Sequence, residues 1–178
     1  MSPSITILRL GHRHDRDARI STHCGLVARA LGADKIIYSG EKDEKLLESV
    51  RNVVKTWGGP FKVEYSESWR KVIKQYKRKK FLIVHGTMYG IPIQKKINEI
   101  IKKRPQRILF IVGSEKVPGE VYRMADFNIA VANQPHSEVA SLTVFLHEFF
   151  KGKELSKKFK KAKLKIVPMP VGKKVEKL

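Results

Sequence analysis

The segment FLIVHGTMYGIPIQKKINEIIKKRPQRILFIV, residues 81–112, decides the fold class. It begins and ends with continuous apolar runs, at 81–85 and 108–112. Such runs are typical of strands that are covered on both faces, as in parallel sheets. Between them, residues 92–103 have helical spacing, and Pro92 suits a first helical turn. A strand, a helix and a second strand in this order predict a parallel crossover unit.

The rest of the chain repeats this alternation of short apolar strands and amphipathic helices. Further predicted strands lie at 5–10, 35–38, 61–65 and 125–132, and further predicted helices at 18–31, 45–57, 68–77 and 137–150. The alternating pattern of the strand at 61–65 suits an outer position, and Ser137 suits the N-cap of the last helix. We therefore predict an α/β fold with a mostly parallel sheet and helices on both faces.

Composition limits the class of protein. The chain has 178 residues and is 42% hydrophobic, which is enough for a folded core. Its single cysteine, Cys24, excludes an intrachain disulfide scaffold and a multi-cysteine zinc site. The longest apolar runs are far shorter than the roughly 20 residues of a membrane span, and no signal-peptide pattern begins the sequence. We expect a cytoplasmic protein with one domain over 1–150 and a basic extension over 151–178, which holds a short strand or hairpin.

The charge points to a polyanionic partner. The chain carries 37 Lys and Arg against 17 Asp and Glu, a formal net charge of +20. Eleven lysines face two glutamates within 151–178, and seven of the eleven residues in 70–80 are basic. Heat-stable proteins also have Lys-rich surfaces, but these usually balance Lys with Glu. The imbalance therefore favours nucleic acid, and RNA in particular, as the partner.

Three turn-rich loops follow predicted strands in the second half of the chain, at 85–90, 113–119 and 133–137. Ligands bind at the carboxyl ends of the strands in parallel sheets, so these loops predict one ligand site built largely from backbone groups. The dinucleotide fingerprint G-x-G-x-x-G and the P-loop pattern are both absent. A nicotinamide enzyme or a P-loop NTPase is therefore not expected.

A polar cluster, GHRHDRDAR at 11–19, follows the first predicted strand and allows three interpretations. Two histidines and two aspartates could bind a metal ion for phosphoester chemistry, but neighbouring arginines would oppose a cation. Arg16 and Arg19, three residues apart on a helix, could instead bind phosphate. The third possibility is a charged helix N-terminus, where the acidic residues meet the helix dipole. Cys24 shares the apolar phase of its helix and is expected in the core.

Three blocks of sequence together resemble one known family. They are RLGHRHDRDARISTHCGLVARALGADKI at 9–36, IVGSEKVP at 111–118 and NQPHSEVASL at 133–142. The chain resembles the archaeal tRNA (cytidine-56-2'-O)-methyltransferases of the SPOUT, or α/β-knot, superfamily. The resemblance covers essentially the whole chain. It implies a C-terminal deep trefoil knot, S-adenosylmethionine as cofactor, a homodimer with its site near the interface, and a cytidine 2'-hydroxyl in the T-loop of tRNA as substrate.

The resemblance also assigns residues to roles. A ribose hydroxyl is a poor nucleophile, so proton removal and alignment fall to the protein. The catalytic candidates are Arg19, then Arg16, with His23 as proton acceptor. The expected cofactor-binding residues are Leu82, His85, Gly86, Ile111, Val112, Gly113, Ser114, Glu115, Ile129, Ala130, Val131, Ala132, Asn133, Gln134, Pro135 and His136. The expected RNA contacts are Arg9, Arg13, Lys157, Lys158, Lys160 and Lys161, and no metal is expected.

Two other functions stay open at this point. One is a metal-dependent RNA phosphoesterase that uses His12, His14, Asp15 and Asp17. The other is a non-catalytic RNA-binding module of the same fold.

Overall fold

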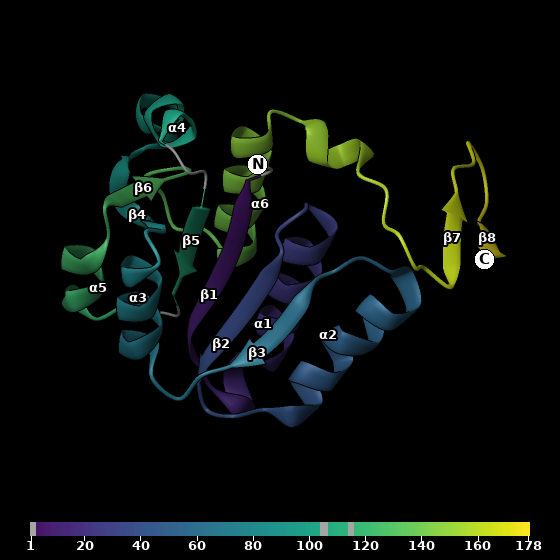
Figure 1. Ribbon diagram of the computed structural model, residues 1–178, viewed down its shortest axis with the longest axis horizontal. Coiled ribbons are helices and arrows are strands. Elements are labelled where there is room, and N and C mark those ends of the chain that lie inside the picture. The colour runs from purple at the N-terminus through teal and green to yellow at the C-terminus, as the bar shows by residue number, and fades with distance from the viewer. Residues whose placement is uncertain (1–2, 104–106, 114–115) are drawn as a thin grey trace.

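A computed structural model of the chain describes residues 3–103, 107–113 and 116–178 (Figure 1). Its centre is a six-stranded sheet in the order β3-β2-β1-β5-β4-β6, and every pairing in that sheet is parallel. The strands are β1 Ser4–His12, β2 Lys35–Gly40, β3 Lys62–Tyr65, β4 Leu82–Pro92, β5 Arg107–Val112 and β6 Phe127–Ala130. The prediction of a parallel α/β sheet is confirmed, and the expected outer strand is the edge strand β3.

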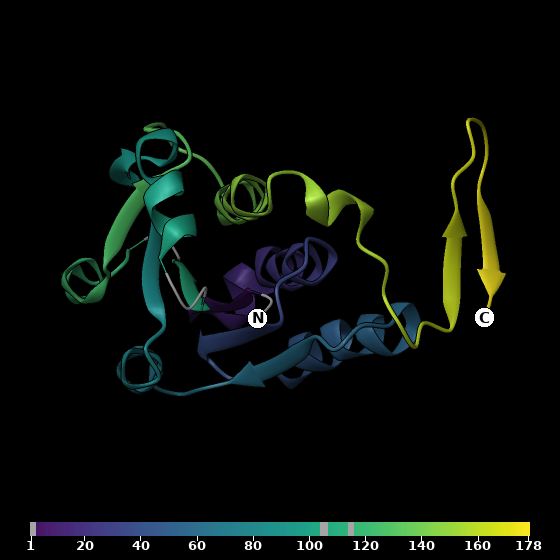
Figure 2. The same cartoon turned by 45° about the horizontal axis from the view of Figure 1, so that its top comes forward.

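Helices cover both faces of this sheet (Figures 1 and 2). On one face lie α1 His14–Ala30, α2 Glu44–Trp57, α4 Ile93–Lys102 and α6 Glu138–Phe150. On the other face lie α3 Trp69–Arg78 and the short α5 Gly119–Met124. Neighbouring strand residues alternate between the two cores, since Ile83 packs with α3 and α5 whereas Val84 packs with α1 and α6. Both faces of the central strands are therefore buried, which explains their continuous apolar sequence.

Side-chain caps and one aromatic stack fix the helices in place. The Ser137 hydroxyl accepts a hydrogen bond from the backbone N–H of Ala140 at 3.2 Å, as expected for the N-cap of α6. Asp43 caps α2 in the same way through Leu46 N–H at 3.0 Å. The rings of Phe110 in β5 and Phe145 in α6 are parallel, with centroids 3.9 Å apart. This stack joins the middle of the sheet to the last helix of the domain.

Two elements differ from the sequence prediction. Strand β4 continues to Pro92 through residues that we expected to form a loop, and it pairs with β6 at Val84–Gly86 and again at 91–92, with a register shift between. Helix α5 was not predicted. With six residues and a glycine at its start, it is too short to show helical periodicity.

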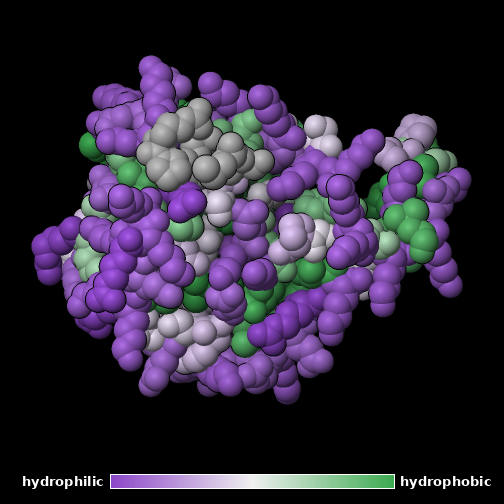
Figure 3. Space-filling view, viewed as in Figure 1, coloured by the Kyte–Doolittle hydropathy of each residue, from purple (hydrophilic) through white to green (hydrophobic). Residues whose placement is uncertain are grey.

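The chain after α6 folds outside the main sheet. It contains a 3-10 helix, η1 Lys153–Ser156, and an antiparallel pair, β7 Leu164–Val167 with β8 Lys174–Lys177. The extension thus holds a separate hairpin, which projects beyond the C-terminal end of α2 (Figures 1 and 3). No helix among the described residues is long and apolar enough to cross a membrane.

Candidate active site

The second half of β4 and the loops that follow β5 and β6 lie at one edge of the sheet. Strand β5 pairs with both β1 and β4, and β4 pairs with β6, so parallel pairing brings their carboxyl ends together. The Asn133 side-chain amide donates hydrogen bonds to the carbonyls of Met88 and Gly90, at 2.7 and 3.0 Å. The segment after β6 is therefore tied to the second half of β4. Of the expected cofactor loop after β5, Ser114 and Glu115 lie outside the described residues.

A buried histidine lies at the centre of this edge. His85 Nδ1 is 2.9 Å from Asn128 Oδ1, and the Asn128 amide donates to the Tyr122 carbonyl at 3.0 Å. Because the asparagine oxygen can only accept, His85 Nδ1 carries the proton and Nε2 is an acceptor. Burial lowers the pKa of His85, although the bond to Asn128 acts in the opposite direction. Its Nε2 is buried without a hydrogen-bond partner among the described residues, so this site holds an acceptor in need of a donor.

Two glycines allow close approach of backbone to side chain at the same edge. A Cβ at Gly86 would collide with the Ser141 hydroxyl and the Phe110 ring. A Cβ at Gly113 would collide with Val117. Larger residues at either position would push the loops apart. Gly86 therefore explains how β4, β5 and α6 pack so closely beneath the loops.

The remaining expected cofactor residues fall in three environments. Side chains of Ile111, Val112, Ile129 and Ala130 are buried in the sheet, so only their backbone could meet a ligand. Val131 is half-buried, and Ala132, Gln134, Pro135 and His136 are exposed in the loop before α6. Leu82 is the first residue of β4 and lines an open cavity of about 670 Å³ with Tyr89, Gly90 and Phe127. The structure thus brings Leu82 beside Tyr89 and Gly90, two residues of the expected loop at 85–90.

Arg9 corrects one expectation. We expected it to contact RNA, but its side chain is fully buried beneath α1 and α6. Its Nη1 donates to the Leu10 carbonyl at 2.7 Å, and its Nη2 lies 3.4 Å from Glu138 Oε1 at the start of α6. A guanidinium in this position cannot reach a phosphate at the surface. It pairs with the helix that follows the cofactor loop instead.

Cys24 lies beside this arginine and is fully buried, so the prediction that it belongs to the core is confirmed. Burial raises the pKa of its thiol to about 12, which the nearby Arg9 partly opposes. A thiol that stays protonated near neutral pH is a poor nucleophile. Cys24 is therefore a packing residue.

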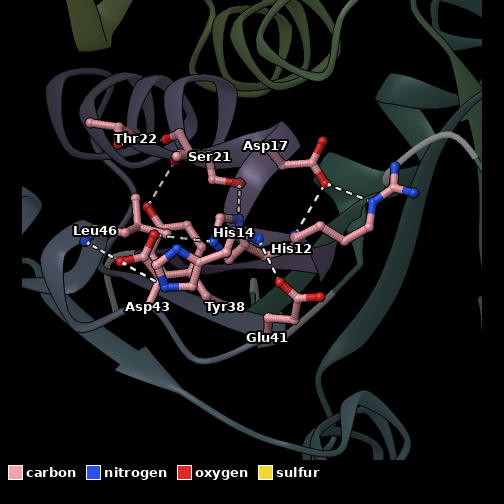
Figure 4. A network of polar contacts seen from close by, with 11 residues as sticks. His12, His14, Asp17, Ser21, Thr22, Tyr38, Glu41, Asp43 and Leu46 are labelled. Carbon is pink, nitrogen blue, oxygen red and sulfur yellow. Dashed lines mark hydrogen bonds and ion pairs between the residues drawn. The ribbon is translucent and has the colours of Figure 1, made fainter.

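A polar network joins the end of β1 to α1 and α2 (Figure 4). His12 Nδ1 lies 2.9 Å from the Ser21 hydroxyl, and its Nε2 lies 3.4 Å from Asp43 Oδ2. Burial lowers the pKa of His12, while Asp43 acts to raise it. The Tyr38 hydroxyl donates to the Ser21 carbonyl at 3.0 Å, which fixes the same turn of α1 from the sheet. The network holds the first turns of α1 in one position.

Three of the four proposed metal ligands have other partners in the structure. His12 is engaged by Ser21 and Asp43, and Asp17 accepts from the Arg13 backbone N–H at 3.2 Å. The His14 backbone N–H donates to Glu41 at 2.6 Å. Within 3–103, 107–113 and 116–178, no group of three or more His, Cys, Asp or Glu side chains could hold a metal ion. The geometry thus gives the phosphoesterase alternative no support.

The three catalytic candidates share one stripe of α1. The helix begins at His14, so Arg16, Arg19 and His23 follow at spacings of three and four residues on its outer face. All three are exposed. A helix turn fixed from below by His12 and Ser21 therefore presents two guanidiniums and an imidazole outward.

The basic extension lies at the other edge of the domain. Lys157 Nζ donates to the Gly32 carbonyl at 3.0 Å, and the Lys160 carbonyl accepts from Gly59 N–H at 2.8 Å. The Arg29 guanidinium lies over the Phe159 ring, 4.6 Å from its centroid. These contacts fix the segment at the C-terminal ends of α1 and α2. All four expected lysines of the extension are exposed, and among them Lys157 is held by the domain through its bond to Gly32.

The sequence missed the polar partners of His85. Asn128 is a polar residue within a predicted strand, which was the available signal, since buried polar residues need partners. Tyr122 lies in the helix that was not predicted, and its ring meets His85 edge-on with centroids 4.7 Å apart. Its hydroxyl lies 3.0 Å from that of Thr87.

Comparisons with known proteins agree on one family. A family model described as "tRNA ribose 2'-O-methyltransferase, aTrm56" matches residues 57–176. A protein of Thermococcus kodakarensis is 55% identical over 177 residues, which is 98% of each chain. One of Methanopyrus kandleri is 49% identical over 178 residues, which is all of this chain and 99% of that one. Both relatives are named tRNA (cytidine(56)-2'-O)-methyltransferase.

Solved structures with low sequence identity share the fold. The crystal structure of an RNA 2'-O ribose methyltransferase matches with a TM-score of 0.62 at 14% identity, over 86% of this chain and 59% of that one. The SpoU methyltransferase AviRb of Streptomyces viridochromogenes, in complex with AdoMet, matches with a TM-score of 0.60 at 14% identity. That match covers 84% of this chain and 57% of that one.

The two buried histidines predict how stability depends on pH. Burial lowers the folded-state pKa of His12 and His85, so below the ordinary value of about 6.5 the unfolded chain binds more protons than the folded one. The stability that depends on the two neutral rings is therefore fully present above a pH of about 6.5. It is lost as the pH falls below that value toward the lower pKa of the folded state. We expect the urea midpoint to fall between pH 7.5 and pH 5.5.

The matched variants are His12→Asn and His85→Asn, which retain a polar group near Nδ1 but cannot titrate. In each of these variants, the urea midpoint should fall less between pH 7.5 and pH 5.5 than in the wild type. The control is His23→Gln on the exposed face of α1, whose urea midpoint should fall as much as that of the wild type. An equal fall in all four proteins would show that the buried rings do not cause it.

Proposed function

Because the chain belongs to the tRNA ribose 2'-O-methyltransferase family whose model it matches, we propose that it methylates the 2'-hydroxyl of cytidine 56 in tRNA, with S-adenosylmethionine as methyl donor. The observation that carries this is the 55% identity with a so-named relative over 98% of both chains. A tRNA substrate also fits the net charge of +20 and a cytoplasmic location.

The residues at the carboxyl edge fit a nucleoside cofactor. His85 Nε2 is an acceptor without a hydrogen-bond partner among the described residues, so it could accept from a hydroxyl or amino group of a ligand. S-adenosylmethionine carries both kinds of group. The loop at 131–136 and the backbone of Ile111 to Gly113 would hold it. When bound, the cofactor supplies an electrophilic methyl group on a sulfonium. Most of the contacts would come from backbone groups, since the sheet side chains at this edge are buried.

The stripe on α1 would act on the ribose. Arg19 and Arg16 would hold the substrate phosphate and so orient the adjoining hydroxyl, because guanidinium forks match phosphate oxygens. An arginine keeps its proton, so it is a poor base. The imidazole of His23 would accept the hydroxyl proton, which leaves a better nucleophile. Arg13, Lys158, Lys160 and Lys161 would contact RNA backbone.

A homodimer would complete the site. The side chains of Arg19 and His23 are exposed on α1, so they are accessible to RNA or to a second copy. In the dimer, α1 of one copy would lie near the loops of its partner. We take 1–150 as the methyltransferase domain and 151–178 as an extension. A trefoil knot in the second half is part of the proposal because the chain resembles the α/β-knot methyltransferases.

Transfer of labelled methyl from S-adenosylmethionine to an unmodified tRNA transcript tests the function. Nuclease digestion should place the label in 2'-O-methylcytidine from the T-loop. Label on a base or on another ribose would contradict the proposed specificity. No label with tRNA still bound would favour a non-catalytic RNA-binding module.

Replacing Arg19 by Ala should lower kcat by at least about a hundredfold, because positioning of the reacting groups is lost. The affinity for S-adenosylmethionine, measured by calorimetry, should not change. Arg107→Ala is the matched control, since Arg107 is exposed at the amino end of β5. Equal turnover of the two variants would refute the catalytic role of Arg19.

The acceptor of His85 can be tested apart from catalysis. His85→Asn retains a donor toward Asn128 but loses the acceptor at the Nε2 position, and we expect cofactor affinity to fall about tenfold. His85→Gln, whose amide oxygen reaches near that position, should retain more of the affinity. Wild-type affinity in His85→Asn would place the cofactor elsewhere.

A further inference from the structure

The outer face of α3 is a basic surface that catalysis does not use. Seven exposed residues form it: Arg70, Lys71, Lys74, Lys77, Arg78, Lys79 and Lys80. The inner face of the helix buries Val72, Ile73 and Tyr76 against the sheet. We call these seven residues the α3 basic surface.

This surface carries charge of one sign. Among the described residues, its carboxylate partner is Glu120 of α5, which lies 2.6 Å from Arg70 Nε. The exposed face of α2 instead mixes charges, with Glu44 and Glu48 among its basic residues. Elsewhere on the chain, an exposed lysine pairs with a glutamate, as Lys42 does with Glu44 at 2.6 Å. A merely solvated Lys-rich face would show such pairs here too.

The arrangement does not favour helix stability. Lys74 has four cationic neighbours at spacings of three or four residues, Arg70, Lys71, Lys77 and Arg78. Like charges at these spacings destabilise a helix. The clustering of positive charge on α3 is therefore not explained by the stability of the helix. Binding of a polyanion, which would neutralise these charges, explains it.

The surface begins beside the candidate active site. The Arg70–Glu120 pair joins the first turn of α3 to the first turn of α5, which follows the cofactor loop at 113–118. The Arg70 guanidinium also lies over the Trp69 ring, 4.3 Å from its centroid. From there the helix runs roughly 15 Å along the sheet toward the start of β4. The α3 basic surface thus leads away from the site on the sheet face opposite to α1 and α6.

We propose that the α3 basic surface binds the sugar–phosphate backbone of tRNA outside the methylated nucleotide. This inference rests on the proposed function. Lysines on successive turns meet phosphates without reading bases, so the surface adds affinity and fixes the direction of the RNA rather than its sequence. Its length spans several phosphates of one strand. An acidic protein would be the other kind of partner, and RNA is favoured because the surface adjoins a site for tRNA.

Neutralisation by Lys71→Gln with Lys74→Gln tests the proposal. Binding of an unmodified tRNA transcript is measured by fluorescence anisotropy from 50 to 300 mM salt. Loss of two phosphate contacts should make the slope of log K against log salt shallower by about 1.5 and weaken binding about tenfold at physiological salt. The KM for tRNA should rise with little change in kcat, and the affinity for S-adenosylmethionine should stay as in the wild type. The melting temperature should not fall, since repulsion around Lys74 is removed.

The matched control is Lys45→Gln with Lys95→Gln. These lysines are exposed on α2 and α4, on the opposite face of the sheet, and each has a glutamate nearby in its helix. The control removes the same net charge, so it should move the salt slope much less. Equal slopes in the two double variants, or a wild-type slope and KM in the α3 variant, would overturn the proposal. If the wild-type enzyme neither binds nor methylates tRNA, the proposed function itself has failed.

Discussion

Parallel pairing of β5 between β1 and β4 is the constraint on which the rest of the molecule depends. It places the carboxyl ends of the central strands at one edge, where the second half of β4 and the loops after β5 and β6 lie. Each crossover helix then runs back, so the C-terminal ends of α1, α2 and α6 lie at the other edge. The site and the docked basic extension are thus separated by the length of the sheet.

Much of this followed from local sequence patterns. Continuous apolar runs such as 108–112 predicted strands buried on both faces, and Ser137 predicted the start of α6. These signals are local, because a strand buried on both faces and a helix with a capping hydroxyl can each be recognised from a few consecutive residues. Helix α5 has no recognisable helical periodicity in its sequence, since its six residues make too few turns. The path of β4 beyond Gly86 depends on pairing with β6, a long-range contact that no local pattern contains.

The site shows the same limit in its charged residues. Arg9 and Arg16 lie in one basic stretch of sequence, yet Arg9 is fully buried beside Glu138 while Arg16 is exposed on α1. The residue type predicts that both side chains are charged, but it does not predict which group each of them contacts. His85 was expected at the cofactor site from a family resemblance. Its proton position and its unpaired acceptor depend on Asn128, 43 residues away along the chain.

Charge is distributed so that the two basic regions lie on different sides of the domain. The extension is tied to the ends of α1 and α2 through Phe159 and Lys160, whereas the basic row of α3 lies on the opposite sheet face and begins beside α5. Neither region is offset by nearby carboxylates to the extent seen on α2. Two separated patches that each retain repulsion suit a ligand that is long, folded and uniformly anionic. A small anion would need only one of them, so the distribution itself argues for a substrate that extends well beyond the nucleotide that reacts.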